Sequence, residues 1–162
     1  MLKAKNIIYG YCTYTTPNKP KYLISLYRSD TLNIVAVFPT SRKRSGVLLT
    51  QHGCNRKDNV PISYVFNANR PIGKKYCSDE DFCFPKQTTI PFDYCFREDS
   101  QENILSSFVQ PTIVGVLSDD EYVDLIYALL HSPHTPKRYK DIFDKVLHEY
   151  LGCLLYTSDA AD

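Results

Sequence analysis

One predicted β-hairpin begins with a lysine and finishes with two adjacent hydroxyl residues. Lys19 precedes Pro20 at the start of the first strand, and Thr40 with Ser41 closes the second. An antiparallel hairpin returns the chain to the end from which it started, so the ammonium and the hydroxyls should meet at one rim of the sheet. An ammonium group donates hydrogen bonds and carries positive charge, and hydroxyls both donate and accept. The pattern therefore predicts a site for a phosphate group.

The segment that must position these groups, residues 19–41, has the composition of two strands joined by a polar turn. Its aliphatic, strand-favouring side chains are Leu23, Leu26, Ile34 and Val35. Between the two apolar runs, Asp30 and Asn33 have the short polar side chains that hydrogen-bond to the backbone in turns. We expect this hairpin to be the centre of the fold.

Basic charge is concentrated in the segment that follows the hairpin. Residues 42–75 hold eight basic side chains and one acid, a balance of +7, whereas the whole chain has a net charge of +1. The basic residues are Arg42, Lys43, Arg44, Arg56, Lys57, Arg70, Lys74 and Lys75. Such clustering is the electrostatic footprint of a surface that binds polyanions, although a loop that is basic only for solubility has the same pattern.

Length and composition indicate one soluble domain. A chain of 162 residues is long enough to bury a single core, and 43% hydrophobic with 23% charged residues is ordinary for a globular protein. No apolar run approaches the roughly 20 residues that cross a membrane, and the first residues lack the pattern of a secretory signal. We therefore expect a cytoplasmic protein that does not enter membranes.

Four further segments have the branched and aromatic composition of strands. They are residues 7–14, 61–66, 82–96 and 110–116. The third should form one long strand or two bent strands, because Pro85 and Pro91 interrupt it. Residues 42 to about 59, in the basic segment, are predicted to be largely a loop, in which residues 47–49 could anchor a short strand.

Two helices are predicted near the end of the chain. Ser118 followed by Glu121 is the pattern of a capping box, in which each side chain bonds the backbone N–H of the other, so a helix should begin there. It should end near Ser132, before a proline. A second helix is expected from about residue 136, with a wide apolar stripe that must pack against the sheet or a second subunit.

The last ten residues, 153–162, do not continue the helical pattern. They resemble translated adapter sequence at the end of an assembled reading frame, and we exclude them from fold and function. The expected domain therefore spans residues 1–152.

A structural zinc site is an alternative use of the cysteines. His52, Cys54, Cys77 and Cys83 would supply the ligands. Their spacings, H-x-C and C-x5-C, match no common zinc-binding pattern, so buried thiols are the simpler expectation.

The order of these features resembles the MazF/PemK-like toxins of type II toxin–antitoxin systems. Lys19 and Pro20 stand where that family has a basic residue and a proline at the start of its second strand. Thr40 and Ser41 stand where it closes the third strand with Thr or Ser. The family's usual cation is arginine, and lysine cannot make the same fork of hydrogen bonds to a phosphate.

The resemblance continues along the chain, over about residues 7–130. Residues 87–89, Gln-Thr-Thr, are similar to the family's later strand with a glutamine and hydroxyls. Residues 115–121 are similar to its closing glycine, serine and acidic residues. The segment between these motifs and the hairpin is longer than the family would lead us to expect, and it is the basic one.

The resemblance implies a fold, an activity and partners. The fold would be α+β: a small SH3-like β-barrel with an inserted basic loop and C-terminal helices. The activity would be that of a metal-independent endoribonuclease without a cofactor, in which an RNA 2′-hydroxyl attacks the adjacent phosphodiester. Lys19, Thr40 and Ser41 would be catalytic. RNA would be bound by Arg42, Lys43, Arg44, Arg56, Lys57 and Gln87. The partners would be RNA, an antitoxin protein and a second copy of the chain.

The sequence does not place a general base for this reaction. The four histidines are His52 in the basic segment and His131, His134 and His148 in the helical end. Asp93 is a further candidate for the base, and Tyr64 and Tyr94 are candidates for stacking on unpaired bases. The alternative function is a non-catalytic SH3-like module that binds RNA or a protein, in which lysine in place of arginine marks lost activity.

Overall fold

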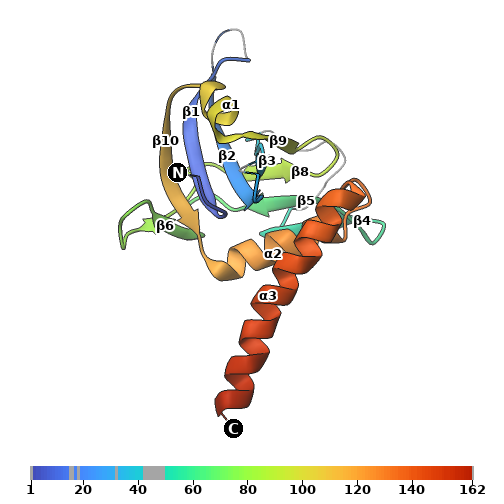
Figure 1. Ribbon diagram of the computed structural model, residues 1–162. Helices are drawn as coiled ribbons and strands as arrows, with labels where there is room; N and C mark the ends of the chain where they lie inside the picture. Colours follow the sequence, from blue (N-terminus) through green and yellow to red (C-terminus); the bar gives the residue numbers. More distant parts are fainter. Residues whose placement is uncertain (1, 15–16, 18, 32, 42–49, 162) are drawn as a thin grey trace.

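Two antiparallel sheets and three helices make up the fold (Figure 1). The structure is a computed structural model that describes residues 2–14, 17, 19–31, 33–41 and 50–161, with side chains described as far as Gly152. The predicted α+β class is confirmed. The strands within these ranges form two sheets, and no closed barrel is detected among them.

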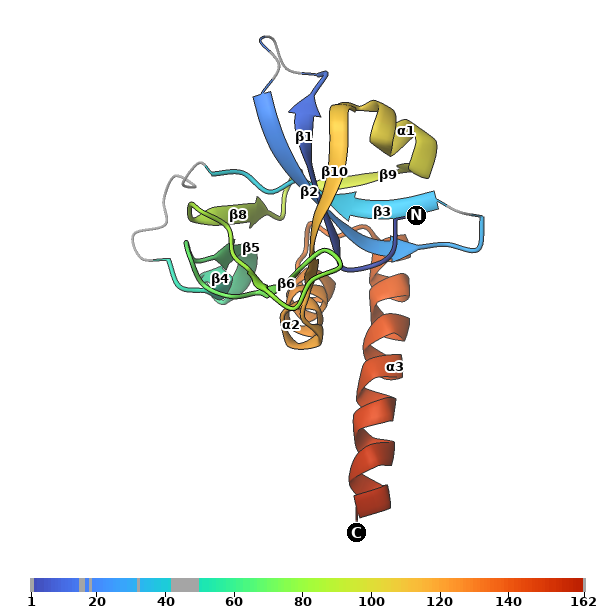
Figure 2. The same ribbon diagram turned by 90° about the vertical axis from the view of Figure 1, so that its left-hand side faces the viewer.

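The larger sheet has seven strands and the smaller has three. In spatial order the larger sheet contains β7 (Asp81–Phe82), β6 (Gly73–Lys75), β10 (Phe108–Leu117), β1 (Asn6–Cys12), β2 (Lys19–Arg28), β3 (Asn33–Val37) and β9 (Phe96–Ser100). The smaller contains β4 (Gly53–Lys57), β5 (Val60–Phe66) and β8 (Thr88–Pro91). Figure 2 shows β1, β2 and β10 side by side, with the smaller sheet to one side of them.

The predicted central hairpin is present as β2 and β3, but the two strands do not pair over their full length. Ile24 lies opposite Val37, and there the pairing ends. The next residues include Pro39, which has no backbone N–H for a ladder, and Thr40 pairs instead with Thr89 of β8. The chain therefore leaves the larger sheet after β3 and joins the smaller one.

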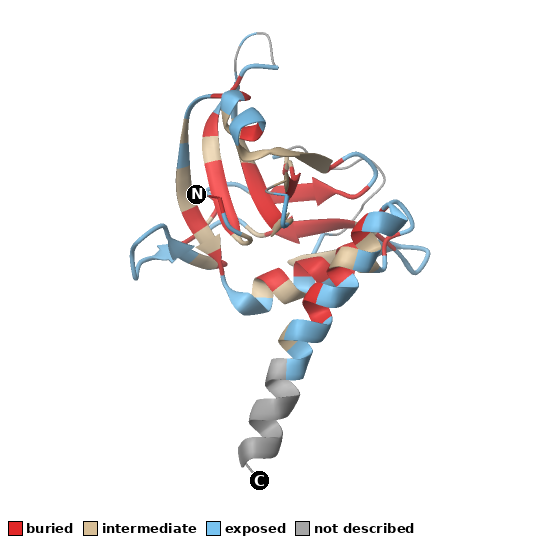
Figure 3. Cartoon of the chain, viewed as in Figure 1, coloured by how far each residue is buried: buried red, intermediate tan, exposed pale blue. Residues whose placement is uncertain are grey.

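The larger sheet is buried on both faces at its centre. One core packs its residues Ile7 and Ile24 against the smaller sheet, α2 and α3, and a second core packs Ile8 and Leu23 against Ile104 of α1. Neighbouring residues of a strand point to opposite faces, which explains why β1, β2 and β3 read as continuous apolar runs. Figure 3 shows that β5 and β8 are also buried over most of their length.

The three helices are α1 (Gln101–Ser106), α2 (Asp119–Leu130) and α3 (Lys137–Ala161). The prediction of α2 is confirmed, and the Ser118 hydroxyl accepts the N–H of Glu121 at 3.3 Å. The expectation that the helical pattern ends before residue 153 is wrong, because the backbone of α3 stays helical to Ala161 (Figure 1). Among the described residues, no helix is long and apolar enough to cross a membrane.

Sequence patterns missed four short elements. The strand β9 shares only Phe96 with the segment 82–96 that was expected to contain strands. The helix α1 buries only Ile104 and has too few residues for a periodic pattern. The strand β4 lies in the segment expected to be a loop, where residues 42–49 fall outside the described residues. The strand β6 lies in a segment rich in turn residues and pairs with β10 over three residues only.

Candidate functional site

A cavity of about 710 Å³ opens where the two sheets approach each other. Its wall combines residues 19–22 of β2 and residues 38–41 after β3 with residues of β8 and of the segments that precede and follow β8 in the sequence. All three residues predicted to be catalytic line it: Lys19, Thr40 and Ser41. The structure thus brings these three residues to one cavity, although the full-length hairpin that was expected to do so is not formed.

The two sides of the cavity are held by different sheets. Lys19 begins β2 and lies opposite Cys12 of β1 in the larger sheet. Thr40 exchanges backbone hydrogen bonds with Thr89 of the smaller sheet, at 2.7 and 2.8 Å. Ser41 follows directly and is exposed. The distance between cation and hydroxyls therefore depends on how the two sheets are joined.

Two more lysines, Lys21 and Lys86, line the same cavity, and none of the described lining residues is acidic. The cavity therefore attracts anions. Neither lysine belongs to the basic segment. The sequence did hold a signal for Lys21, because residues two apart on a strand lie on the same face, as Lys19 and Lys21 do. Lys86 is next to Gln87, but its place at the cavity follows only from the docking of β8.

Aromatic rings form much of the remaining wall. The rings of Tyr9 and Tyr22 lie 4.8 Å apart between centroids, and Tyr22 packs edge-on against Phe84 at 4.8 Å. Burial raises the pKa of Tyr22, so its hydroxyl stays protonated and can donate a hydrogen bond at neutral pH. Tyr94 also lines the cavity and is 72% exposed.

The described residues among those predicted to bind RNA do not line this cavity. Arg42, Lys43 and Arg44 lie outside the described residues. Arg56 and Lys57 are exposed on β4 and do not line the cavity. Gln87 does not line it either, and its amide donates to the Thr50 hydroxyl at 3.0 Å. A role of these residues in RNA binding stays a prediction.

Part of the basic segment is neutralised by ion pairs. Lys74 pairs with Asp81 at 2.7 Å, and Lys75 pairs with Glu80 at 2.9 Å, both across the β6–β7 hairpin. Among the described residues, charge that is clustered along the sequence is therefore divided between β4 of the smaller sheet and this hairpin of the larger one.

His52 belongs to a buried polar cluster away from the cavity. Its Nδ1 accepts the backbone N–H of Asn67 at 3.1 Å, so its Nε2 carries the proton and donates to the Glu121 carboxylate. The Tyr64 hydroxyl donates to the other carboxylate oxygen at 2.6 Å. These contacts fasten the smaller sheet to the first turn of α2. Both ring nitrogens of His52 are occupied, which leaves none to serve as a general base.

The same cluster corrects two sequence-based expectations. Tyr64 is 1% exposed, so it cannot stack on a base from solution. Glu121 does not complete a reciprocal capping box, because its carboxylate binds His52 and Tyr64, and the backbone N–H of Ser118 donates to Ile72 instead at 2.9 Å. Burial and the Glu121 charge also raise the pKa of Tyr64.

No other candidate base lines the cavity within the described residues. The three remaining histidines, His131, His134 and His148, are exposed in the helical end of the chain. Asp93 is exposed beside Tyr94 and does not line the wall. The cavity thus offers cations, hydroxyls and aromatic rings, and neither an imidazole nor a carboxylate from the part of the chain described.

The zinc alternative finds no support in the side-chain arrangement. Within the described ranges, no group of three or more His, Cys, Asp or Glu residues could hold a metal ion. His52 is engaged by Glu121 and Asn67, and Cys77 is exposed in the turn after β6.

The chain matches no protein-family model, no curated protein and no solved structure.

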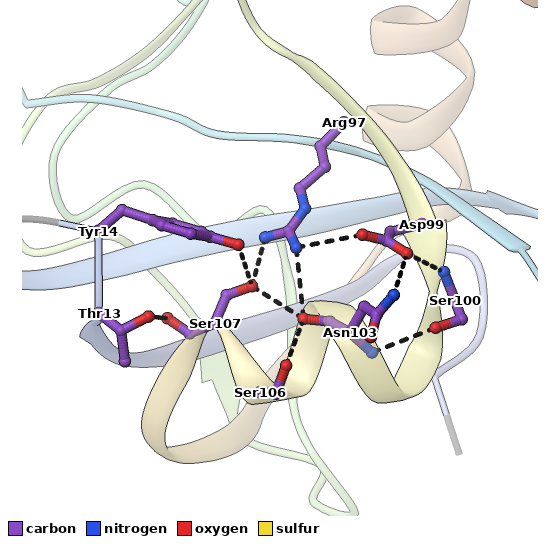
Figure 4. Close-up of polar contacts among 8 residues, drawn as sticks. All are labelled: Thr13, Tyr14, Arg97, Asp99, Ser100, Asn103, Ser106 and Ser107. Atoms are coloured by element: carbon purple, nitrogen blue, oxygen red, sulfur yellow. Dashed lines mark hydrogen bonds and ion pairs between the residues drawn. The ribbon is translucent and has the colours of Figure 1, made fainter.

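A second polar cluster lies where α1 meets β9 and the residues that follow β1 (Figure 4). The Arg97 guanidinium donates to the Ser107 hydroxyl and to the carbonyl of Asn103, the latter at 3.3 Å. The Ser107 hydroxyl donates to the same carbonyl at 2.9 Å and is 3.1 Å from the Tyr14 hydroxyl. Hydrogen bonds, first from the Asn103 amide, lower the pKa of Asp99. The cluster fastens α1 to β9 and to the end of β1.

Proposed function

We propose that the protein is a metal-independent endoribonuclease that cuts single-stranded RNA in the cavity between the two sheets. One observation supports this most strongly: Lys19, which is distant in the sequence from Thr40 and Ser41, lines the same cavity as these two residues. Lys21 and Lys86 add positive charge there, and no described lining residue opposes it. A phosphodiester is the anionic group that this donor set suits best.

The proposed reaction is transesterification within the RNA. The 2′-oxygen attacks the adjacent phosphorus while the bond to the 5′-oxygen breaks, which leaves a 2′,3′-cyclic phosphate and a 5′-hydroxyl. Lys19 stabilises the charge that develops on the phosphorane or protonates the leaving 5′-oxygen. The hydroxyls of Thr40 and Ser41 donate to the non-bridging oxygens. The proton of the 2′-hydroxyl goes to solvent, since no imidazole or carboxylate among the described residues lines the cavity.

The proposal includes what the motif resemblance implies beyond the reaction. We propose an SH3-like arrangement of the strands, a homodimer, an antitoxin partner and a cytoplasmic location. The bridge between Thr40 and Thr89 supports the first of these, because it couples a strand of the larger sheet to the smaller one. The three cavity lysines suit an antitoxin segment with acidic side chains.

The test is incubation of the purified protein with single-stranded RNA in excess EDTA. Wild-type protein should cut the RNA, and Lys19→Ala should lose about 100-fold or more in rate. Lys19→Arg should retain activity, because a guanidinium supplies both charge and paired hydrogen bonds. Lys145→Ala removes the same charge from the exposed face of α3 and should cut like the wild type. Intact RNA with wild-type protein would reject the proposal.

A second candidate function is RNA binding without cleavage. It is favoured by the lack of an imidazole or carboxylate among the described lining residues and by lysine at position 19. This function predicts RNA affinity that falls steeply with salt, and RNA that remains intact. Equal binding by wild type and by a variant without Lys19, Lys21 and Lys86 would exclude it.

A further inference from the structure

We propose that the mouth of the cavity is a base-stacking subsite, in which the ring of Tyr94 takes the face of one unpaired base and Lys21 and Lys86 bind the flanking phosphates. The ligand is a single-stranded RNA with at least one unstacked base. The inference shares the cavity with the proposed function, and it requires binding of RNA but not cleavage.

Tyr94 lies in the turn between β8 and β9, directly after the exposed Asp93. This pair is flanked by Phe92 and Cys95, which are only 1% and 2% exposed. The Phe92 N–H donates to Ile62 at 3.1 Å, and the Cys95 carbonyl accepts the N–H of Phe38 at 3.2 Å. A turn anchored at both ends presents a ring that is 72% exposed. Little backbone entropy remains to be lost when a base stacks on that ring.

Packing in the hydrophobic cores does not explain why an aromatic side chain stands at position 94. Neither of the two hydrophobic cores includes it, although other aromatic residues nearby, such as Tyr22 and Phe84, pack against or within the main core. Tyr94 is 72% exposed, so most of its surface is accessible to a ligand in the cavity. A base provides a flat surface of similar size to its ring, and stacking of this kind accepts any base.

The cavity that Tyr94 lines also carries positive charge. Lys21 and Lys86 line the same cavity as Tyr94, and no described acidic residue lines it. A nucleic-acid strand carries one phosphate per nucleotide, so a base on Tyr94 brings phosphates of its own and neighbouring nucleotides toward these ammonium groups. Bases in a duplex are stacked on each other and covered, and only an unpaired base offers its face. The subsite should therefore prefer single strands.

The experiment uses the full-length protein and a short 2′-O-methyl RNA that carries 2-aminopurine and cannot be cut by 2′-hydroxyl attack. Wild-type protein should bind the RNA and quench the fluorescence of the modified base. Tyr94→Ala should bind roughly 5- to 100-fold more weakly and lose the quenching. Tyr94→Phe should behave like the wild type, since the ring is kept.

Matched variants separate the stacking from the charge. Tyr127→Ala removes a tyrosine of α2 that is 52% exposed and does not line the cavity, and it should not change binding. Lys86→Ala should reduce the slope of log affinity against log salt by about 0.7, while Tyr94→Ala should leave that slope unchanged. An RNA lacking the base at one position should bind wild type and Tyr94→Ala equally.

Three results would overturn the subsite. They are unchanged binding by Tyr94→Ala, a duplex bound as tightly as the single strand, and loss of self-association or of protein binding as the only effect of Tyr94→Ala. The outcome is separable from that of the proposed function. Quenching by a protein that leaves ordinary RNA intact would reject the nuclease and keep the subsite, whereas cleavage with unchanged binding by Tyr94→Ala would reject the subsite alone.

Discussion

Thr40 and Thr89 exchange both of their backbone hydrogen bonds, with the N–H of each donating to the carbonyl of the other at 2.7 and 2.8 Å. Thr40 follows the larger sheet and Thr89 belongs to the smaller one, so this pair joins the two sheets at the wall of the cavity. Because both backbone bonds of Thr40 are formed, the direction of its Cα–Cβ bond is fixed by the pairing of the two sheets.

This relationship predicts that the chemistry of Thr40 can be removed without loss of the fold. Thr40→Val keeps the branched shape and the backbone bonds and removes only the hydroxyl. RNA cleavage should fall about 100-fold, while the free energy of unfolding should change by less than about 1 kcal/mol. Thr112→Val, on an exposed position of β10, is the matched control and should alter neither quantity. Cleavage at the wild-type rate by Thr40→Val would exclude the hydroxyl from the reaction.

The composition of the cavity wall predicts how cleavage depends on pH. Without an imidazole or carboxylate from the described residues at the wall, the 2′-hydroxyl proton leaves to solvent, and the rate should follow hydroxide concentration. The rate under saturating RNA should rise about tenfold per pH unit between about pH 6 and 8. A bell-shaped profile in that range would instead reveal an acid and a base that titrate within the protein.

The hydrogen bonds that the Glu121 carboxylate accepts from His52 and Tyr64 predict that its replacement by an amide destabilises the fold. Glu121→Gln replaces a carboxylate oxygen by an N–H₂ group, which then faces either the Tyr64 hydroxyl or His52 Nε2–H, both donors. The free energy of unfolding, measured with urea, should fall by about 1–3 kcal/mol. Asp120→Asn, one residue earlier and exposed, should cost no more than about 1 kcal/mol through the helix dipole. Equal urea midpoints for the two variants would contradict this role of Glu121.

Two buried tyrosine hydroxyls and one buried cysteine thiol predict a loss of stability at alkaline pH. Burial raises the pKa of Tyr64 and Tyr122 above the ordinary tyrosine value and raises the pKa of Cys95 to about 12. Groups whose pKa is raised on folding stabilise fully below their unfolded pKa, about 9 for the thiol and 10 for the phenols, and this contribution is lost as pH rises toward the folded values. Each group should add about 1.4 kcal/mol per pH unit to the decline.

Tyr122→Phe measures how much one tyrosine hydroxyl contributes to this loss of stability at alkaline pH. Tyr122→Phe should be less stable at pH 7, because the Tyr122 hydroxyl donates to the carbonyl of Leu26 at 2.6 Å within the core. Above about pH 10 its stability should fall less steeply than that of the wild type, by one proton. Urea unfolding between about pH 8 and 11 measures both effects. Identical slopes would show that the Tyr122 proton is not retained on folding.

A buried hydroxyl without a partner predicts a neutral or stabilising substitution. Ser25 is fully buried in β2, and its hydroxyl has no hydrogen-bond partner among the described residues. Ser25→Ala removes that polar atom and should leave the free energy of unfolding unchanged or raise it by about 1 kcal/mol. Ser132→Ala is the comparison, because the buried Ser132 hydroxyl accepts the N–H of His134 at 3.2 Å, and this variant should be destabilised. A lower midpoint for Ser25→Ala would mean that its hydroxyl is satisfied.

Local patterns predicted the elements that form through local interactions. The hairpin of β2 and β3 follows from two apolar runs around a polar turn, and the start of α2 follows from the Ser118 cap. The partner of Thr40 could not be predicted in this way, because Thr89 is distant in sequence and the pairing depends on Pro39 ending the ladder with β2. The sequence therefore pointed to Lys19, Thr40 and Ser41 of the cavity but not to the way in which the cavity is built.

Long-range partners also explain the errors at charged residues. Glu121 has the spacing of a capping residue, yet burial beside His52 and Tyr64 provides hydrogen bonds that replace the reciprocal cap. The positive charge that the described residues bring to the cavity comes from Lys19, Lys21 and Lys86, which all lie outside the basic segment. Neither fact is contained in the order of residues, because each depends on which strands and helices dock against one another.

The most direct test of the central claim is the chemistry of the RNA ends after incubation in EDTA. Mass spectrometry of the fragments should find a 2′,3′-cyclic phosphate on one product and a 5′-hydroxyl on the other. A substrate with a single 2′-deoxy position at the cut should stay intact there. Fragments that end in a 3′-hydroxyl and a 5′-phosphate, or RNA that remains whole at high protein concentration, would contradict cleavage by the lysine and hydroxyls of this cavity.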